Sequence, residues 1–396
     1  MAASSLTFKS EIENLLAEGI VGARRREAET FDELSGHGDT DIVLFGGGNL
    51  GRRTLIGLRK IGIEPVCFLD NNQARWGGEV EGVPVLSPSD GAARYGANAI
   101  FVITVWGALA TDRMSSRVTQ LRSLGCRTVL PFVPLYWKYA STFLPHYTID
   151  SPHLVHLQAD RVREAFYLFA DEESRREYVA QIRFRLLGDF DCLPNRAAGP
   201  IYFRDDLFNL REDEIFVDCG GFDGDSLSLF LEITRNSFNE AIVFEPDPSN
   251  FAKLKNSVDE LPANVAQRIA LHRAATGKAD SRVMMEIGGG PSSQIGNGDE
   301  EVECFALDSI LKGAPVSFIK MDIEGSEIDT LAGAEAVIKK NAPILAISAY
   351  HRQDHLWRIP LLIHQLSPDY ELYLRPHNLE GWDLVCYAVP KDRKPA

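Results

Sequence analysis

The sequence predicts an α/β protein with two parallel sheets, each flanked by helices, and a helical segment between them. Two stretches carry this prediction, because each contains an apolar strand, a glycine-rich turn and the start of a helix. They run over Asp41–Gly51 and Ile215–Ser226. The chain of 396 residues is also long enough for more than one hydrophobic core, so we expect two domains.

Residues 1–40 are predicted to form an amino-terminal helix. Ile12, Leu16 and Ile20 recur at helical spacing between Phe8 and Leu34, and charged residues fill the opposite face. No apolar signal core precedes this helix, and the longest apolar run of the chain is too short to cross a bilayer. We therefore expect a cytoplasmic protein with no transmembrane segment.

Residues 41–150 are predicted to form a Rossmann-like domain of the nucleotide-binding type. A strand from Asp41 leads into the string GGGNLG, which fits G-x-G-x-x-G and opens a helix. The next strand ends at an acid, roughly 20 residues after the glycines, as in dinucleotide-binding folds. The candidate residues of a nucleotide site in this domain are Gly46, Gly48, Gly51 and Asp70.

The sequence is compatible with more than one ligand state of this domain. The stretches FLDNN and WGGEVEGVPVLSP resemble the amino-terminal nucleotide- or sugar-sensing domains of sugar-modifying transferases, which implies a nucleotide or nucleotide-sugar partner. A domain without any ligand fits the residues equally well. A dehydrogenase would rest on the glycine motif alone, because no catalytic constellation for hydride transfer follows it.

Residues 151–201 are predicted to be a helical linker. Val162, Phe166 and Phe169 recur at helical spacing within Leu154–Leu187, and Gly188 ends the pattern. We interpret the aromatic stripe as packing rather than as a cofactor site.

A second α/β domain is predicted over residues 202–396. Asp218 ends its first strand, and Gly220 and Gly221 form a turn where a side chain would collide with a ligand. The helix after the turn points its amino end back at it, which suits a carboxylate or phosphate. The second strand ends in Glu245, which is placed to accept hydrogen bonds from the hydroxyls of a ribose.

These features predict a nucleoside cofactor, and their charge favours S-adenosylmethionine over a dinucleotide. The carboxylate of Asp218 would repel a pyrophosphate, whereas it can accept from the ammonium of a methionine tail. Phe222 and Pro246 flank these residues, and an adenine could lie at Ala274, after the third strand; all three join the candidate cofactor site. The alternative is an ordinary tight turn followed by a surface glutamate.

The remaining elements of this domain continue the α/β alternation and end in a hairpin. The loop GGGPSSQIGNGDE is interpreted as a hairpin tip or an active-site lid, because it lacks the lysine of a phosphate-binding loop. The predicted strands and helix are Asn250–Leu261 (helix), Ile269–His272, Val283–Ile287, Val302–Phe305, Val316–Met321, Ile344–Ala349, Tyr370–Leu374 and Leu384–Val389.

Composition excludes some classes of function. The sequence has 41 basic and 56 acidic residues, which gives a net charge of −15. This negative charge argues against a nucleic-acid groove and against binding to anionic membranes. The six cysteines are scattered without a C-x-x-C pair, so we interpret them as buried residues in a reducing compartment.

Four strings in order, VDCGGFDGDS, FEPDPSNFAKL, FIKMDIEGSEIDTLAGAE and AISAYHRQDHLWRIP, resemble the FkbM-type methyltransferases from Tyr202 to the end. Those are S-adenosylmethionine-dependent O-methyltransferases of bacterial natural products and glycans. The resemblance implies a seven-stranded Rossmann-like methyltransferase sheet. It also implies that Asp218, Gly220 and Gly221 hold the methionine tail and that Glu245 holds the ribose.

The candidate catalytic residues are Asp322, Glu324 and His351. Asp322 and Glu324 follow the central strand and His351 follows its neighbour, and ligands of open α/β sheets bind at such strand ends. A hydroxyl acceptor needs a base as its proton leaves, and His351 or Asp322 is the candidate. Alternatively, Glu324 is a carboxylate at a helix amino end and His351 a structural histidine.

A divalent metal is considered but not favoured. His351 and His355 could hold an ion together with Asp322 or Glu324 if the two histidines shared a helix face. His351 is expected to precede the helix, however, so we assign no metal ligands.

The sequence thus predicts an S-adenosylmethionine-dependent O-methyltransferase (EC 2.1.1 class) that acts on a hydroxyl of a sugar, glycan or natural product. A polyketide or lipid hydroxyl is a further acceptor class. The alternative from a different class is a non-catalytic nucleotide-sugar sensor with a methyltransferase-like fold. The expected partners are a small-molecule or glycan acceptor and no nucleic acid.

Overall fold

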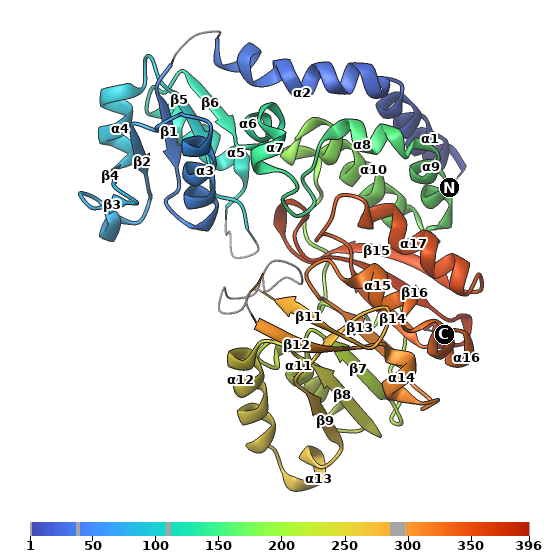
Figure 1. Cartoon of the computed structure of the whole chain (residues 1–396). Coiled ribbons are helices and arrows are strands. Elements are labelled where there is room, and N and C mark those ends of the chain that lie inside the picture. Colours follow the sequence, from blue (N-terminus) through green and yellow to red (C-terminus); the bar gives the residue numbers. More distant parts are fainter. Residues whose placement is uncertain (1, 37–39, 108–111, 286–297, 299, 396) are drawn as a thin grey trace. The chain divides into compact units, whose positions relative to one another are not determined.

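The computed structural model describes residues 2–36, 40–107, 112–285, 298 and 300–395, which divide into two compact units (Figure 1). The first unit comprises residues 1–159, 179–195 and 378–382, and the second comprises residues 160–178, 196–377 and 383–396. Among the helices of the described residues, none is both long and apolar enough to cross a membrane.

The first unit contains a six-stranded sheet in the order β3-β4-β2-β1-β5-β6. All neighbouring strands are parallel except β3 and β4, which form a short antiparallel pair at one edge that the sequence analysis did not include. The elements are α1 (Ala2–Leu16), α2 (Gly19–Ser35), β1 (Ile42–Phe45), α3 (Asn49–Lys60), β2 (Cys67–Leu69), β3 (Glu79–Val80), β4 (Val83–Leu86), α4 (Pro88–Tyr95), β5 (Ile100–Ile103), α5 (Met114–Ser123), β6 (Thr128–Pro131), α6 (Val133–Lys138), α7 (Ala140–Phe143) and α8 (Pro152–Leu157).

Two predicted helices are interrupted. The amino-terminal helix is two helices, because the chain turns at Ala17 and Glu18 and α2 begins at Gly19, which has a φ of +70°. The predicted helix over Leu154–Leu187 is three helices, of which α8 is the first; the others are α9 (Ala159–Leu168) and α10 (Glu172–Leu187). Periodicity therefore located the helical segments but not the breaks between them.

The second unit is built on a seven-stranded sheet in the order β15-β16-β14-β13-β7-β8-β9, which confirms the predicted strand number. The elements are β7 (Ile215–Cys219), α11 (Asp225–Thr234), β8 (Glu240–Phe244), α12 (Pro248–Asp259), α13 (Ala263–Ala266), β9 (Ile269–His272), β10 (Ala275–Thr276), β11 (Ser281–Met285), β12 (Glu300–Phe305), α14 (Leu307–Leu311), β13 (Phe318–Met321), α15 (Glu327–Ala332), α16 (Glu335–Asn341), β14 (Ile344–Ser348), α17 (His355–Leu366), β15 (Glu371–Pro376) and β16 (Leu384–Val389).

The connectivity of this sheet reverses between β7 and β13. From β7 the chain adds β8 and β9 on one side, and it later adds β13 and β14 on the other, all parallel. The antiparallel hairpin of β15 and β16 completes the sheet beside β14, as predicted. In open α/β sheets, ligands bind at the carboxyl ends of the strands beside such a reversal.

The hairpin of β11 and β12 pairs antiparallel as predicted, and β10 adds to it. The loop that joins its two strands, interpreted above as a lid, lies almost wholly outside the described residues.

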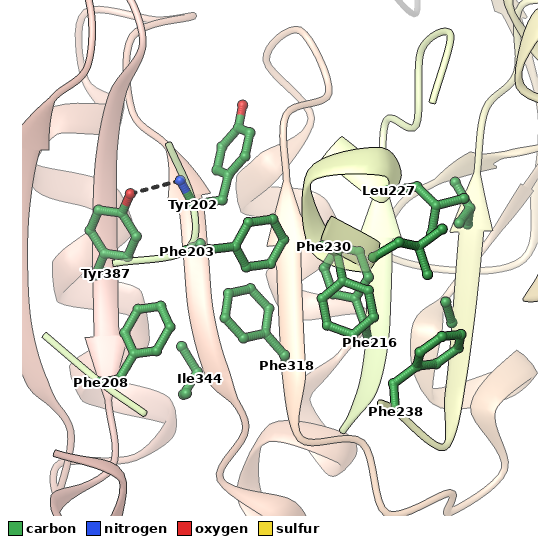
Figure 2. Packing of buried hydrophobic residues seen from close by; sticks show 14 of the residues in the cluster. Tyr202, Phe203, Phe208, Phe216, Leu227, Phe230, Phe238, Phe318, Ile344 and Tyr387 are labelled. Atoms are coloured by element: carbon green, nitrogen blue, oxygen red, sulfur yellow. Dashed lines mark hydrogen bonds between the residues drawn. The ribbon is translucent and has the colours of Figure 1, made fainter. Parts of the chain in front are cut away.

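Aromatic side chains fill the core of the second unit (Figure 2). Phe216 on β7 stacks on Phe230 of α11 with ring centroids 4.5 Å apart, and Phe318 on β13 lies next to Phe216. The backbone N–H of Tyr202 donates to the hydroxyl of Tyr387 at 3.0 Å, which fixes the segment that enters this unit. The core thus holds together the two strands at which the connectivity reverses.

We predict that Phe216→Ala lowers the free energy of unfolding by about 3–5 kcal/mol, because the lost ring leaves a cavity between β7 and α11. Ile233→Ala, a control on the outer face of α11 where 39% of the residue is exposed, is expected to cost less than about 1 kcal/mol. Denaturant unfolding of both variants measures the difference. Equal losses would contradict the packing described here.

Candidate functional site

The glycine turn after β7 packs against the ends of two other strands. The N–H groups of Gly220 and Gly221 each donate to the carbonyl of Phe244 at 2.9 Å. A Cβ on Gly220, which has a φ of +86°, would lie 2.0 Å from the backbone oxygen of Asp322, and one on Gly221 would lie 2.3 Å from the side chain of Val243. The chain's own packing therefore excludes larger residues at both positions, which is a reason for these glycines in addition to the predicted closeness to a ligand.

Asp218 lies within β7 and not at its end, contrary to the sequence analysis. It faces Lys320, its register partner on β13, and the Lys320 ammonium is 2.9 Å from its carboxylate. The same ammonium donates to the carbonyl of Gly220 at 2.6 Å, and the Ser226 hydroxyl donates to the second oxygen of Asp218. Burial disfavours the charged lysine, but the carboxylates of Asp218 and Asp322 outweigh burial and raise the pKa of Lys320.

Glu245 follows the end of β8 and is held by two backbone groups. Its oxygens accept from the N–H of Phe222 and from the N–H of Asp247, each at 2.8 Å. We call this arrangement the carboxylate clamp. Burial raises the pKa of Glu245 to about 7, although both of these hydrogen bonds lower it. Pro246, which follows the acid, is partly buried.

Ala274 follows β9 and is buried. It lines a pocket of about 470 Å³ between the end of β9 and the hairpin of β11 and β12. The pocket thus lies beside β9, the edge strand of the seven-stranded sheet. The sequence analysis predicts an adenine at Ala274.

Asp322 follows β13 and sits directly beside the glycine turn. Its carboxylate accepts from the hydroxyls of Tyr202 at 2.8 Å and Tyr350 at 3.3 Å, and 26% of its side chain is exposed. Burial and the nearby Asp322 raise the pKa of both tyrosines well above the usual value, so both remain protonated donors. The structure therefore brings Asp322 and Gly220 together, as expected for strand ends at the reversal.

His351 is buried among three carboxylates. Its Nδ1 is 2.8 Å from Glu327, and its Nε2 is 3.3 Å from Asp322 and 3.7 Å from Glu324. Burial lowers the pKa of the imidazole, but these carboxylates outweigh burial and raise it to about 10. His351 is then a cation at neutral pH and has no lone pair with which to accept a proton. This favours Asp322 among the two candidate bases.

Glu324 adopts a φ of +53°, which is uncommon for a residue with a side chain. Its Oε2 is buried and accepts no hydrogen bond from any residue that the structure describes. Burial raises the pKa of this carboxyl to about 7, and Asp322 and Glu327 add to the increase against the opposing effect of His351. The carboxylate in the first turn of the following helix, α15, belongs to Glu327. The alternative interpretation, in which Glu324 is the carboxylate at that helix end, therefore does not match the structure.

The two histidines considered for a metal both contact Glu327. His351 lies before α17, as expected, and His355 begins that helix with its Nδ1 3.2 Å from Glu327. Within the described residues, Asp322, Glu327 and His351 offer ligand atoms within 4.8 Å of one another. The ring of His351 lies between two of these carboxylates, 2.8 Å from Glu327 and 3.3 Å from Asp322.

The candidate residues of the first unit lie after β1 and β2. A Cβ on Gly46 would lie 2.3 Å from the side chain of Val105, and one on Gly51 would lie 1.9 Å from the Gly46 carbonyl. A Cβ on Gly48 would meet no atom within 4 Å. Asp70 follows β2 and accepts from the backbone beside the glycine turn.

Comparisons with known proteins agree with this geometry. Residues 218–376 match the model of the methyltransferase FkbM domain. The chain carries an FkbM methyltransferase domain. It is also similar to a crystal structure of methyltransferase FkbM from Methylobacillus flagellatus KT, at 25% sequence identity and a TM-score of 0.78, over 98% of this chain and 100% of that one. The protein is therefore an S-adenosylmethionine-dependent methyltransferase of the EC 2.1.1 class.

Other solved structures share only part of this FkbM-domain methyltransferase. An S-adenosylhomocysteine-bound methyltransferase from Podospora anserina is 14% identical, covering 45% of this chain and 72% of that one, with a TM-score of 0.26. That score is too low to carry an argument. No curated protein matches the chain.

The sequence did not predict four residues that contact the candidate site, which are Tyr202, Lys320, Glu327 and Tyr350. Lys320 carried a signal, because a lysine inside an apolar strand requires a buried partner. Glu327 carried a weaker one, because an acid often opens a helix. Both tyrosines reach Asp322 from distant parts of the chain, and no local pattern reveals that contact.

We predict a pH dependence of stability from Glu245. Its folded pKa of about 7 lies above the ordinary 4.5, so the folded protein binds this proton more tightly than the unfolded chain does. Protonated Glu245 therefore contributes to the free energy of unfolding, on the order of 3 kcal/mol. This contribution is fully present below about pH 4 and is lost as the pH rises through about 7.

Denaturant unfolding of wild type and Glu245→Gln between pH 4 and 8 tests this. The difference in unfolding free energy between the two proteins should fall with rising pH. The amide in the carboxylate clamp adds a cost to this difference that does not change with pH. A difference that stays level across the range would show that Glu245 ionises at its ordinary pKa.

Proposed function

We propose that the protein methylates a hydroxyl oxygen of a sugar, glycan or natural-product acceptor. The observation that carries this proposal is Asp322, a partly exposed carboxylate beside the glycine turn whose two tyrosine partners both donate to it. A carboxylate in this position can accept a proton from a hydroxyl group that approaches the strand ends.

The cofactor side of the site fits a nucleoside with an amino-acid tail. In the carboxylate clamp, each oxygen of Glu245 accepts one backbone N–H, and a carboxylate oxygen has a second lone pair that can accept from a ribose hydroxyl. We assign Gly220, Gly221, Phe222 and Pro246 to the walls of this site, and Ala274 to the adenine side, where the pocket at the end of β9 offers space.

The contacts of Asp218 argue against a role in binding the methionine ammonium. Its carboxylate already binds Lys320 and Ser226 inside the sheet. We propose instead that Asp218 acts through Lys320, whose ammonium holds the carbonyl of Gly220 and thereby the shape of the turn.

When bound, S-adenosylmethionine supplies a methyl group attached to a positively charged sulfur. The residues of the chain align the acceptor and remove its proton. Asp322 takes the hydroxyl proton at a carboxylate oxygen, while Tyr202 and Tyr350 fix the direction of that carboxylate. The imidazolium of His351 stabilises the negative charge of Asp322 before the proton arrives, and Glu327 orients the ring.

We predict that Glu245→Ala weakens binding of S-adenosylhomocysteine by about 1.5–3 kcal/mol, the range for a lost hydrogen bond to a charged group. Calorimetric titration measures this. Glu240→Ala is the control, because this glutamate lies at the opposite end of the same strand. If wild type and Glu245→Ala bind S-adenosylhomocysteine with equal affinity, Glu245 does not bind the ribose.

We predict that Asp322→Asn lowers kcat about 100-fold or more while the affinity for S-adenosylhomocysteine stays within twofold, because general-base catalysis contributes about that much. The assay follows S-adenosylhomocysteine release with a panel of sugar, glycan and polyketide acceptors. Asp308→Asn, at the far helix α14, provides a carboxylate control. Full activity of Asp322→Asn would exclude it as the base.

A further inference from the structure

The second unit contains another pocket, of about 400 Å³, to which the proposed site assigns no role. One wall is the segment that leads to Tyr202 and comprises residues 196–199 and Ile201. The other wall is the end of the hairpin of β15 and β16, with His377 and Asp383. We call this space the β15–β16 pocket.

The β15–β16 pocket lies at the same edge of the sheet as Asp322. His377 follows β15 and Asp383 precedes β16, whose residue Val385 pairs with Ser348 near the carboxyl end of β14. Asp322 follows β13, the parallel neighbour of β14. In the strand order, β13 stands between this hairpin and β9, beside which the other pocket lies. The strand that leads to Asp322 is thus placed between the two pockets.

Tyr387 and Tyr202 connect the wall of the pocket to Asp322. The hydroxyl of Tyr387 accepts from the backbone N–H of Tyr202 at 3.0 Å (Figure 2). The same hydroxyl lies 2.7 Å from Nε2 of His377. The side-chain hydroxyl of Tyr202 donates to Asp322 at 2.8 Å. Tyr202 therefore fixes both the pocket wall and the direction of the proposed base.

His377 supplies a hydrogen-bond donor at the pocket. The buried hydroxyl of Tyr387 needs an acceptor for its own proton, and His377 is the one that the described residues offer. Burial, together with the cations Arg204 and Arg375, lowers the pKa of His377 to about 4, so the ring is neutral. A neutral imidazole that accepts at Nε2 carries its proton on Nδ1. Among the described residues, none accepts from this Nδ1–H.

Asp383 supplies a carboxylate at the same wall. The backbone N–H of His377 donates to the carbonyl of Asp383 at 3.0 Å, so the two side chains leave neighbouring points of the hairpin end. Burial raises the pKa of Tyr202 and Tyr350, and the charges of Asp322 and then Asp383 raise it further. The field of the Asp383 carboxylate thus reaches the two hydroxyls that donate to Asp322. The pocket combines a donor and an acceptor close to the proposed base.

We propose that the β15–β16 pocket binds a saccharide acceptor, with one ring hydroxyl accepting from Nδ1 of His377 and another donating to Asp383. A hydroxyl group can both donate and accept, so neighbouring hydroxyls of a sugar ring match this pair. Ile201 adds an apolar surface for the C–H face of the ring. The inference rests on the proposed methylation of a hydroxyl group and selects the saccharide among its acceptor classes.

The experiment measures ligand binding to the full-length protein in the presence of S-adenosylhomocysteine, by saturation-transfer NMR titration. The probes are the methyl glycosides of glucose, mannose, galactose and rhamnose. Cyclohexanol is the matched ligand control, because it has a six-membered ring with a single hydroxyl. We expect at least one glycoside to bind, and cyclohexanol to bind at least tenfold more weakly. Absence of binding by every glycoside would overturn the proposal, as would equally tight binding of cyclohexanol.

Substitutions at His377 separate binding from a structural role. In His377→Gln the side-chain amide reaches the position of Nε2 and can accept from Tyr387, but no donor remains at the position of Nδ1. In His377→Asn the amide lies near the position of Nδ1 and can donate there. We expect glycoside binding to weaken at least tenfold in His377→Gln and less in His377→Asn. The reverse order would show that His377 acts only through Tyr387 and would refute its contact with the acceptor.

Asp383→Asn tests the second contact. Asp383 has a φ of +50°, a conformation that asparagine also adopts readily, so the variant should keep its melting temperature. We expect it to bind the glycoside at least tenfold more weakly and S-adenosylhomocysteine within twofold of wild type. Unchanged glycoside affinity in this folded variant would remove Asp383 from the pocket's function.

Two matched controls lie outside the pocket. His364→Gln changes an exposed histidine in the last turn of α17, and Asp369→Asn changes an acid before β15 whose side chain is 93% exposed. Both should bind the glycoside like wild type. Because binding is measured without turnover, a glycoside that binds but is not methylated would count against Asp322 as the base and support the pocket. Methylation of another hydroxyl compound by a protein that binds no glycoside would overturn the pocket and leave hydroxyl methylation standing.

Discussion

The second unit depends on one buried ion pair, that of Lys320 and Asp218. The two residues are register partners on β13 and β7, the strands between which the connectivity of the sheet reverses. Removing two charges from water is costly, and such a pair persists only when further hydrogen bonds satisfy it. Here the Ser226 hydroxyl and the Gly220 carbonyl supply them. The pair thus joins the strand that carries the glycine turn to the strand that carries Asp322.

From this pair the site extends in two directions. Along β7 the chain turns at Gly220 towards the clamp of Glu245, which we propose as the cofactor side. Along β13 the chain reaches Asp322 and its tyrosines, which we propose as the acceptor side. Beyond Asp322, the positively charged ring of His351 lies among three carboxylates. The electrostatic balance of the acceptor side is therefore set by buried groups and is shielded from salt.

Local features of the sequence predicted the parts of this site that one strand, turn and helix determine. Glu245 and the glycine turn lie where the pattern placed them, and β9 begins and ends at the predicted residues, Ile269 and His272. Contacts between distant segments were not predictable, because register is set by the whole core. The partner of Lys320, the donors to Asp322 and the cationic state of His351 all belong to this class. The packing of Gly220 against Asp322 was not predictable for the same reason.

The packing of Gly220 against the backbone of Asp322 has a consequence for how ligands arrive. Two main chains in close contact restrict the conformations of the turn, and its shape is formed in the structure without a ligand. Preorganisation of this kind removes the entropic cost of ordering the loop on association. It also makes a rearrangement of this turn an unfavourable way for one substrate to affect the binding of the other.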